Sequence, residues 1–140
     1  RLKNIVNSLR LNKYINFISE VYNKKLNHYY DKADIGLSAL AWHRVGITFP
    51  SNIKSREYCV IGLPYLYSGN DPLINNKFKY AFQVPEENGP IDIMKILQYK
   101  NSIYENKQFP EKMQIFAAKN LTWEHAMNNF LKLLLIEKQN

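Results

Sequence analysis

Residues 53–71 read IKSREYCVIGLPYLYSGND, and this stretch decides how the middle of the chain is expected to fold. Its first half places charged residues before an apolar run, and Gly62 then follows as a typical helix stop. Pro64 opens a short Tyr/Leu segment, and proline is tolerated at the first position of a strand. The stretch therefore predicts a helix over 52–61, a strand over 64–67 and a turn at 69–72.

Helices and strands are predicted to alternate on both sides of this stretch. The predicted strands are 14–18, 34–38, 64–67 and 79–84. The predicted helices are 2–11, 23–32, 52–61, 91–105, 110–118 and 122–137, with Ser51 and Thr122 as N-caps and a loop over 39–50. Strands that alternate with helices at this spacing indicate an α/β domain with a parallel sheet, spanning residues 1–140.

The composition is ordinary for a soluble globular protein, and the charge is unevenly distributed. The 140 residues are 46% hydrophobic and 22% charged, with a net charge of +7. Six Lys and Arg residues stand against one Glu in residues 1–30, so the positive field lies near the N-terminus. Such a field favours an anionic partner, either a nucleotide, a nucleic acid or an acidic membrane surface. The alternative is an ordinary solvated basic face.

Cysteine and histidine usage argues against disulfide and metal chemistry. Cys59 is the single cysteine, which agrees with a reducing cytoplasm and is expected to lie in the core. His28, His43 and His125 lie far apart and have no partners at ligand spacing, so no metal site is expected. No apolar run approaches the roughly 20 residues that a membrane span needs.

The charged cluster Lys54, Arg56 and Glu57 falls at the start of a helix that follows a predicted parallel strand. Ligands of such sheets bind outside the carboxyl ends of the strands, and a helix N-terminus attracts anions such as phosphate. Lys54 opposes the helix dipole, a small cost that a bound diphosphate would offset. Glu57, one turn further in, can accept the two hydroxyls of a ribose, while Arg56 is expected to face solvent or another domain. The alternative is a solvated helix face.

These residues also resemble a known family. The segment from Ser51 to Pro64 resembles the donor-binding segment of retaining glycosyltransferases with the two-domain GT-B fold, where a helix with a Lys and a Glu runs into Gly-x-Pro and a strand. The segments 33–38 and 16–21 are similar to the two strands that precede that helix, and Trp123 resembles the family's C-terminal pattern. His43-Arg44 followed by Lys-Ser-Arg-Glu-Tyr is most similar to bacterial surface-polysaccharide transferases of the group 1 type.

The resemblance implies a Rossmann-like donor-binding domain, the C-terminal half of a GT-B fold that is incomplete at its N-terminus. The implied substrate-binding residues are Glu57 for the ribose, Ser51 and Lys54 for the diphosphate, His43 and Arg44 in a loop that closes over the nucleotide or sugar, and Ser19 to Val21 for the base. The sequence departs from the family at Phe49, which stands where the family has the first of two glutamates.

The implied function is transfer of a glycosyl group from a nucleoside-diphosphate sugar to a polysaccharide or lipid-linked acceptor, without a cofactor. The resemblance further implies a separate acceptor-binding domain and peripheral membrane contact at the cytoplasmic face, and the 140 residues alone are expected to be inactive. The alternative is a non-catalytic α/β module that binds nucleotides or nucleic acid. Nucleic acid is not expected as a partner, because six tyrosines fall on predicted core faces and not on a stacking surface. They are Tyr14, Tyr22, Tyr30, Tyr65, Tyr67 and Tyr80.

Overall fold

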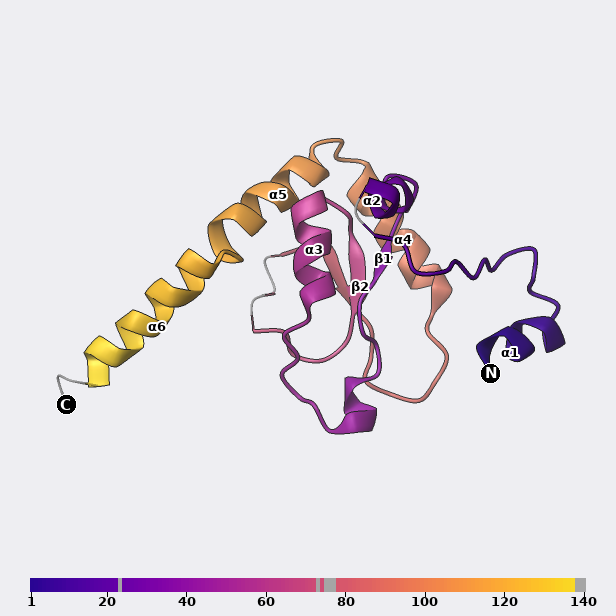
Figure 1. Ribbon diagram of the computed structural model, residues 1–140, viewed down its shortest axis with the longest axis horizontal. Helices are drawn as coiled ribbons and strands as arrows, with labels where there is room; N and C mark the ends of the chain where they lie inside the picture. The colour runs from indigo at the N-terminus through magenta and orange to yellow at the C-terminus, as the bar shows by residue number, and fades with distance from the viewer. Residues whose placement is uncertain (23, 73, 75–77, 138–140) are drawn as a thin grey trace. The chain divides into compact units, whose positions relative to one another are not determined.

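A computed structural model describes residues 1–22, 24–72, 74 and 78–137 (Figure 1). The chain divides into two compact units, residues 1–32 and residues 33–140. All buried hydrophobic residues of the described chain except Val6 belong to the second unit. The hydrophobic core of the protein is therefore the core of residues 33–140.

The N-terminal unit holds two short helices, α1 (Leu2–Ser8) and α2 (Lys24–Tyr30). Both confirm predicted helices, although Asn23, the predicted start of the second, lies outside the described residues. The predicted strand at 14–18 was wrong, because this segment pairs with no other strand in the described chain. An alternating pattern becomes a strand only where a neighbour takes up its backbone hydrogen bonds. Tyr14 and Tyr22 are also exposed, at 71% and 67%, against the expectation of a core face.

The second unit is built on a small parallel sheet. Its strands are β1 (Gly36–Leu37), β2 (Tyr65–Tyr67) and β3 (Ala81–Gln83), in the order β1-β2-β3. Gly36 pairs with Tyr65, and Leu66 pairs with Phe82. The α/β class and the parallel pairing are confirmed, and each strand is shorter than its predicted range.

Four α-helices accompany the sheet in the described chain, and all four confirm predicted helices. They are α3 (Ile53–Ile61), α4 (Ile93–Tyr104), α5 (Phe109–Asn120) and α6 (Trp123–Glu137). The predicted loop over 39–50 contains a short 3-10 helix, η1 (Trp42–Val45). Thr122 caps α6 as predicted, since its Oγ1 accepts a hydrogen bond from the backbone N–H of His125 at 3.1 Å.

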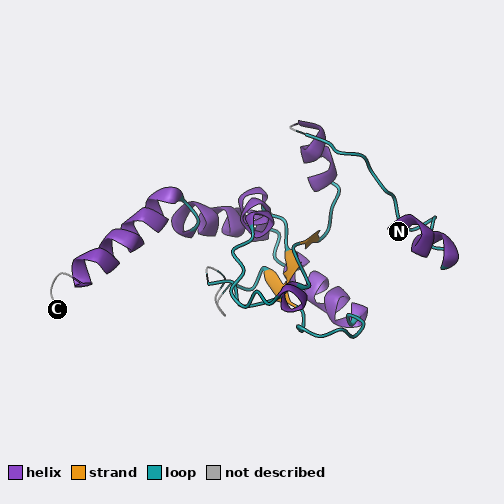
Figure 2. Cartoon of the chain, turned by 60° about the horizontal axis from the view of Figure 1, so that its bottom comes forward, coloured by secondary structure: helices purple, strands orange, loops and turns teal. Residues whose placement is uncertain are grey.

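The helices cover both faces of the sheet. Tyr65 is fully buried, and its ring centroid lies 5.7 Å from that of Tyr58 on α3. Phe82 points to the opposite face, where its ring lies 5.2 Å from that of Tyr99 on α4. Helix α5 runs beside α3, as Figures 1 and 2 show. The second unit is thus a three-layer α/β/α arrangement, with α3 and α5 on one side and α4 on the other.

Two glycines make this packing possible. A Cβ on Gly36 would lie 2.8 Å from the Tyr58 ring, so only glycine lets β1 approach α3 this closely. Gly62 ends α3 in the left-handed conformation (φ 76°), as predicted, and a Cβ there would lie 2.7 Å from Pro110 of α5.

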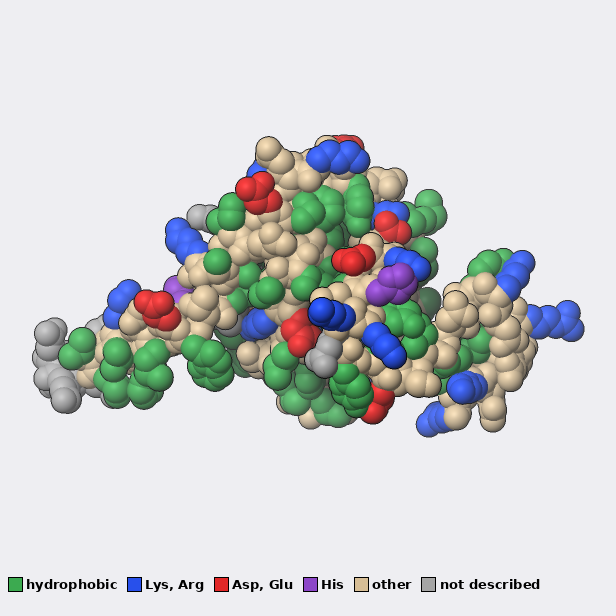
Figure 3. Space-filling view, turned by 45° about the horizontal axis from the view of Figure 1, so that its top comes forward, with side chains coloured by type: hydrophobic (Ala, Val, Ile, Leu, Met, Phe, Trp, Pro, Cys, Tyr) green, Lys and Arg blue, Asp and Glu red, His purple; other side chains and the backbone are tan. Residues whose placement is uncertain are grey.

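Helix α6 presents an apolar surface beyond this core. Trp123, Met127, Phe130 and Leu131 are all exposed, and Figure 3 shows hydrophobic side chains along the helix. Within the described chain, no helix is both long enough and apolar enough to cross a membrane.

Candidate functional site

The candidate site lies at the carboxyl edge of the sheet. Because β1, β2 and β3 are parallel, the loops that leave them meet at the same edge. These loops span residues 38–52, 68–72 and 84–92. Helix α3 begins at this edge, and Figure 1 shows its first turn above the loop that contains η1.

The first turn of α3 is capped by Asn52 and not by Ser51, so that part of the sequence prediction was wrong. The Oδ1 atom of Asn52 accepts a hydrogen bond from the backbone N–H of Lys54 at 3.0 Å. The Ser51 hydroxyl instead accepts a hydrogen bond from Arg56 Nη2 at 3.3 Å. Adjacent polar residues before a helix offer two possible caps, and here the guanidinium of Arg56 draws Ser51 away from the helix end.

Three predicted binding residues lie at or near the start of α3. Ser51, Lys54 and Glu57 are all exposed, and Lys54 and Glu57 are one turn apart on α3. The cation and the carboxylate are therefore both accessible to solvent. This is the accessibility that binding of a diphosphate and a ribose requires.

Arg56 was expected to face solvent or another domain, and that expectation was wrong. Its guanidinium forms a bidentate ion pair with Asp71, in which Nη2 lies 2.8 Å from Oδ1 and Nη1 contacts Oδ2. The two side chains are only 17% and 4% exposed. The pair joins α3 to the loop after β2. Arg56 therefore fixes this loop against the start of α3 and is not a free surface cation.

A buried serine pair makes a second link that sequence reasoning missed. The hydroxyls of Ser38, just after β1, and Ser55 on α3 lie 2.9 Å apart. Ser55 is 1% exposed and shares the buried face of α3 with Tyr58 and Cys59. The i, i+3, i+4 spacing of these three residues was the available signal that Ser55 points inward and needs a partner.

His43 and Arg44 lie on η1 and contact a different loop. Arg44 Nε donates a hydrogen bond to Asn88 Oδ1 at 2.9 Å, and His43 Nε2 lies 3.4 Å from the same oxygen. Asn88 therefore ties the loop after β1 to the loop after β3. The buried Nδ1 atom of His43 has no hydrogen-bond partner among the described residues.

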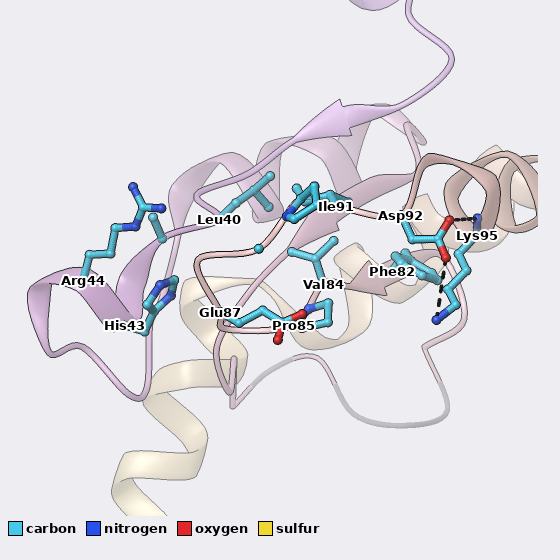
Figure 4. A pocket seen from close by; sticks show the side chains of 13 residues that line it. Leu40, His43, Arg44, Phe82, Val84, Pro85, Glu87, Ile91, Asp92 and Lys95 are labelled. Carbon is cyan, nitrogen blue, oxygen red and sulfur yellow. Dashed lines mark hydrogen bonds and ion pairs between the residues drawn. The ribbon is translucent and has the colours of Figure 1, made fainter.

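His43 and Arg44 also line a pocket of about 310 Å³ between these two loops. Figure 4 shows Leu40, Val84 and Ile91 around the middle of this pocket, with Arg44 at its rim and directed away from it. Neither Lys54 nor Glu57 lines it. The predicted closing loop is thus at the carboxyl edge, but it borders a pocket separate from the first turn of α3.

A second pocket of about 310 Å³ opens at the end of β2. Asp71, the ion-pair partner of Arg56, is among its lining residues. No residue of α3 is among the described lining of this pocket, so the ion pair between Asp71 and Arg56 is its link to that helix. Its described lining also includes Phe49, Tyr67, Gly69, Asn70 and Gln83.

The two remaining predicted residues, Ser19 and Val21, lie in the extended segment before α2. They belong to the N-terminal unit, residues 1–32, and the sheet belongs to the other unit. Contact between these residues and a nucleotide base stays a prediction.

Burial raises the pKa values of two titratable groups in the core, Cys59 and Tyr65. Desolvation raises the pKa of the Cys59 thiol to about 11, and the Tyr65 hydroxyl 3.7 Å away acts in the opposite direction without outweighing burial. The pKa of Tyr65 is raised well above its usual range, again mainly by desolvation. Cys59 is thus a buried core thiol, as predicted, and it offers no nucleophile at neutral pH. In the described part of the chain, no cluster of His, Cys, Asp and Glu side chains has the makings of a metal site.

Comparisons of this chain with protein-family models, with curated proteins and with solved structures found no match.

Proposed function

We propose that this chain is the donor-binding domain of a retaining glycosyltransferase of GT-B type and that it binds a nucleoside-diphosphate sugar at the carboxyl edge of its sheet. One observation supports this most directly. Helix α3 begins at that edge, and Lys54 in its first turn and Glu57 about one turn further in are both exposed. A cation and a carboxylate one turn apart on a helix N-terminus suit a ligand with an anionic part beside a diol.

Each residue has a role in this proposal. The diphosphate lies against Lys54, Ser51 and the N-terminal amides of α3, where the helix dipole favours negative charge. Glu57 accepts hydrogen bonds from the ribose hydroxyls. When the glycosyl bond breaks, negative charge develops on the departing diphosphate, and the same groups stabilise it.

The acceptor in this proposal is a glycan or a lipid-linked sugar, held by a separate acceptor-binding domain. Transfer then takes place at the cytoplasmic face of a membrane. The basic N-terminal unit, with six Lys and Arg residues against one Glu in residues 1–30, suits an anionic surface there.

Titration of variants of the full-length protein tests the donor site. Each protein is titrated calorimetrically with UDP, GDP and ADP and with the matching nucleosides, at low and high salt. Glu57→Ala is expected to weaken binding of both ligand types at least about tenfold, because it removes charge-assisted hydrogen bonds to the ribose. Lys54→Ala is expected to weaken the diphosphates only, with a smaller loss at high salt.

Two exposed residues, one just after α4 and one on α5, serve as matched controls. Glu105→Ala and Lys112→Ala make the same chemical changes away from the carboxyl edge and are expected to leave binding unchanged. Equal, small effects from all four variants would mean that Lys54 and Glu57 belong to an ordinary solvated helix face and do not bind the ligand.

A further inference from the structure

The pocket between η1 and the loop after β3 has a mostly apolar lining. Its apolar side chains are those of Leu40, Phe82, Val84, Pro85, Pro90 and Ile91. Figure 4 shows His43 at one end of the pocket and Phe82 at the other. A volume of about 310 Å³ is at the small end of the range for ligand pockets. The pocket therefore suits a small ligand with an apolar body, such as a single ring.

The cationic and donor groups of the lining are turned to protein partners. Arg44 Nε donates to Asn88 Oδ1 at 2.9 Å, which identifies this atom as the amide oxygen. His43 Nε2 lies 3.4 Å from the same oxygen. Because an amide oxygen only accepts, Nε2 is the ring nitrogen that carries the proton in this contact. Lys95 is directed to Asp92, with its Nζ atom 3.8 Å from Oδ2.

The polar groups that remain for a ligand are acceptors. The carboxylate of Glu87 lines the pocket, is exposed, and forms no hydrogen bond or ion pair with another described residue. His43 Nδ1, buried in the pocket wall, is also without a described partner, and it is an acceptor when Nε2 holds the proton. Asp92 is occupied, because its Oδ1 atom caps α4 by accepting from the N–H groups of Met94 and Lys95. A ligand that matches this lining carries a donor and, opposite Glu87, a positive charge.

The walls of the pocket are fixed at three points. Asn88 ties the loop after β3 to Arg44 of η1. At the start of that loop, the N–H of Val84 donates to the Tyr67 carbonyl at 2.8 Å, which holds the loop to the sheet. At its end, Asp92 is the N-cap of α4. A pocket whose walls are already held loses little conformational entropy when a ligand binds.

We infer that this pocket binds a small apolar amine, whose ring packs on Leu40 and Ile91 and whose ammonium group pairs with Glu87. No residue of α3 is among the described lining of the pocket. The inference therefore goes beyond the proposed function and does not depend on it. It gives the carboxyl edge of the sheet a second ligand site, selective for cations, apart from the exposed Lys54 and Glu57.

Three probes that share a benzene ring and differ in charge test the inference on the full-length protein. They are benzylamine, benzyl alcohol and benzoate, and Kd is measured by ligand-observed NMR titration at pH 7. Benzylamine is expected to bind with a Kd of roughly 1 mM, as befits a ligand of this size. Benzyl alcohol is expected to bind about fivefold more weakly, because it lacks the charge that pairs with Glu87. Benzoate is expected not to bind.

Three variants assign the binding to this pocket. Glu87→Gln is expected to weaken benzylamine about fivefold and to leave benzyl alcohol within twofold, so the two probes become equal. Glu86→Gln removes the neighbouring exposed carboxylate, which does not line the pocket, and is expected to change neither probe. Ile91→Ala is expected to weaken both probes about fivefold through lost apolar contact.

The inference is overturned if wild-type protein does not bind benzylamine, or if it binds benzoate as well as benzylamine. Equal losses from Glu87→Gln and Glu86→Gln would also overturn it, because they would mean that benzylamine responds only to the overall surface charge. Glu87 and Ile91 are exposed, so unchanged melting temperatures are expected for their variants and confirm that each variant is folded. Calorimetric titration of Glu87→Gln with UDP, GDP and ADP is expected to match wild type, which separates this pocket from the proposed donor site.

Discussion

The ion pair between Arg56 and Asp71 is the residue-scale contact that holds the candidate site together. It connects the first turns of α3 to the loop after β2 through two hydrogen bonds of a partly buried guanidinium. Arg56 Nη2 also donates to Ser51. Removing either partner would take the bidentate ion pair away from a largely buried charge, which is costly in a protein interior.

Asp71→Ala and Arg56→Ala are each expected to lower the free energy of unfolding by roughly 3–5 kcal/mol, because each strands a buried charge. Urea denaturation followed by tryptophan fluorescence measures the loss. The double variant Arg56→Ala/Asp71→Ala is expected to lose less than the sum of the two single changes, since it removes both charges of the pair. Additive losses, or single variants as stable as wild type, would show that the pair does not stabilise the loop.

At the scale of elements, two glycines in the left-handed conformation allow the cost of backbone strain to be compared with the cost of lost packing space. Gly46 follows η1 with φ 71°, and among the described residues no heavy atom beyond its two chain neighbours lies within 4 Å of a Cβ built on it. Gly62 ends α3 with φ 76°, and a Cβ there would meet the backbone and ring of Pro110 at 2.7–3.0 Å. Both positions strain any other residue, but only Gly62 lacks space.

Gly46→Ala is therefore expected to cost about 1–2 kcal/mol of unfolding free energy, which is the strain of a left-handed alanine. Gly62→Ala is expected to cost clearly more, because α5 must also move away from the end of α3. Chemical denaturation of the two variants side by side gives the difference. Equal losses would mean that the contact between α3 and α5 adjusts without cost.

At the scale of the whole molecule, the stability at alkaline pH is expected to depend on two buried titratable groups, a thiol and a phenol. Cys59 and Tyr65 are both fully buried, and burial raises the pKa of each. Both groups must therefore stay protonated in the folded protein, while the unfolded chain loses these protons at lower pH. The folded state loses stability as the pH rises through this window.

The free energy of unfolding is expected to fall between pH 9 and pH 11, the ordinary and folded pKa values of Cys59. Cys59 alone accounts for about 2–3 kcal/mol of this loss. Denaturation curves at pH 8, 9, 10 and 11 measure the slope, and Cys59→Ala is expected to flatten it. If wild-type protein and Cys59→Ala show the same slope, other groups cause the loss of stability at alkaline pH.

The local elements could be predicted from the sequence because their signals are local. The charged start, the apolar run and Gly62 predicted α3 and its end, and the alternation of strands with helices predicted the parallel α/β sheet. The exposure of Lys54 and Glu57 also followed from helical spacing. What these two residues bind remains a prediction, because a sequence pattern does not contain the ligand.

Only the tertiary structure decided which distant residues are partners. From the sequence alone, Arg56 is predicted to be a surface cation. The tertiary structure places Asp71, 15 positions later, beside it, and the two residues form an ion pair. Ser55 likewise finds Ser38 only when α3 packs on β1, and Phe49 lines a pocket only because Thr48 and Pro50 meet the loop after β2. The segment 14–18 has the pattern of a strand but no described neighbour to pair with. Caps and periodicity arise within a few residues, whereas ion pairs, buried hydrogen bonds and strand pairing require segments that are distant in sequence to meet in space.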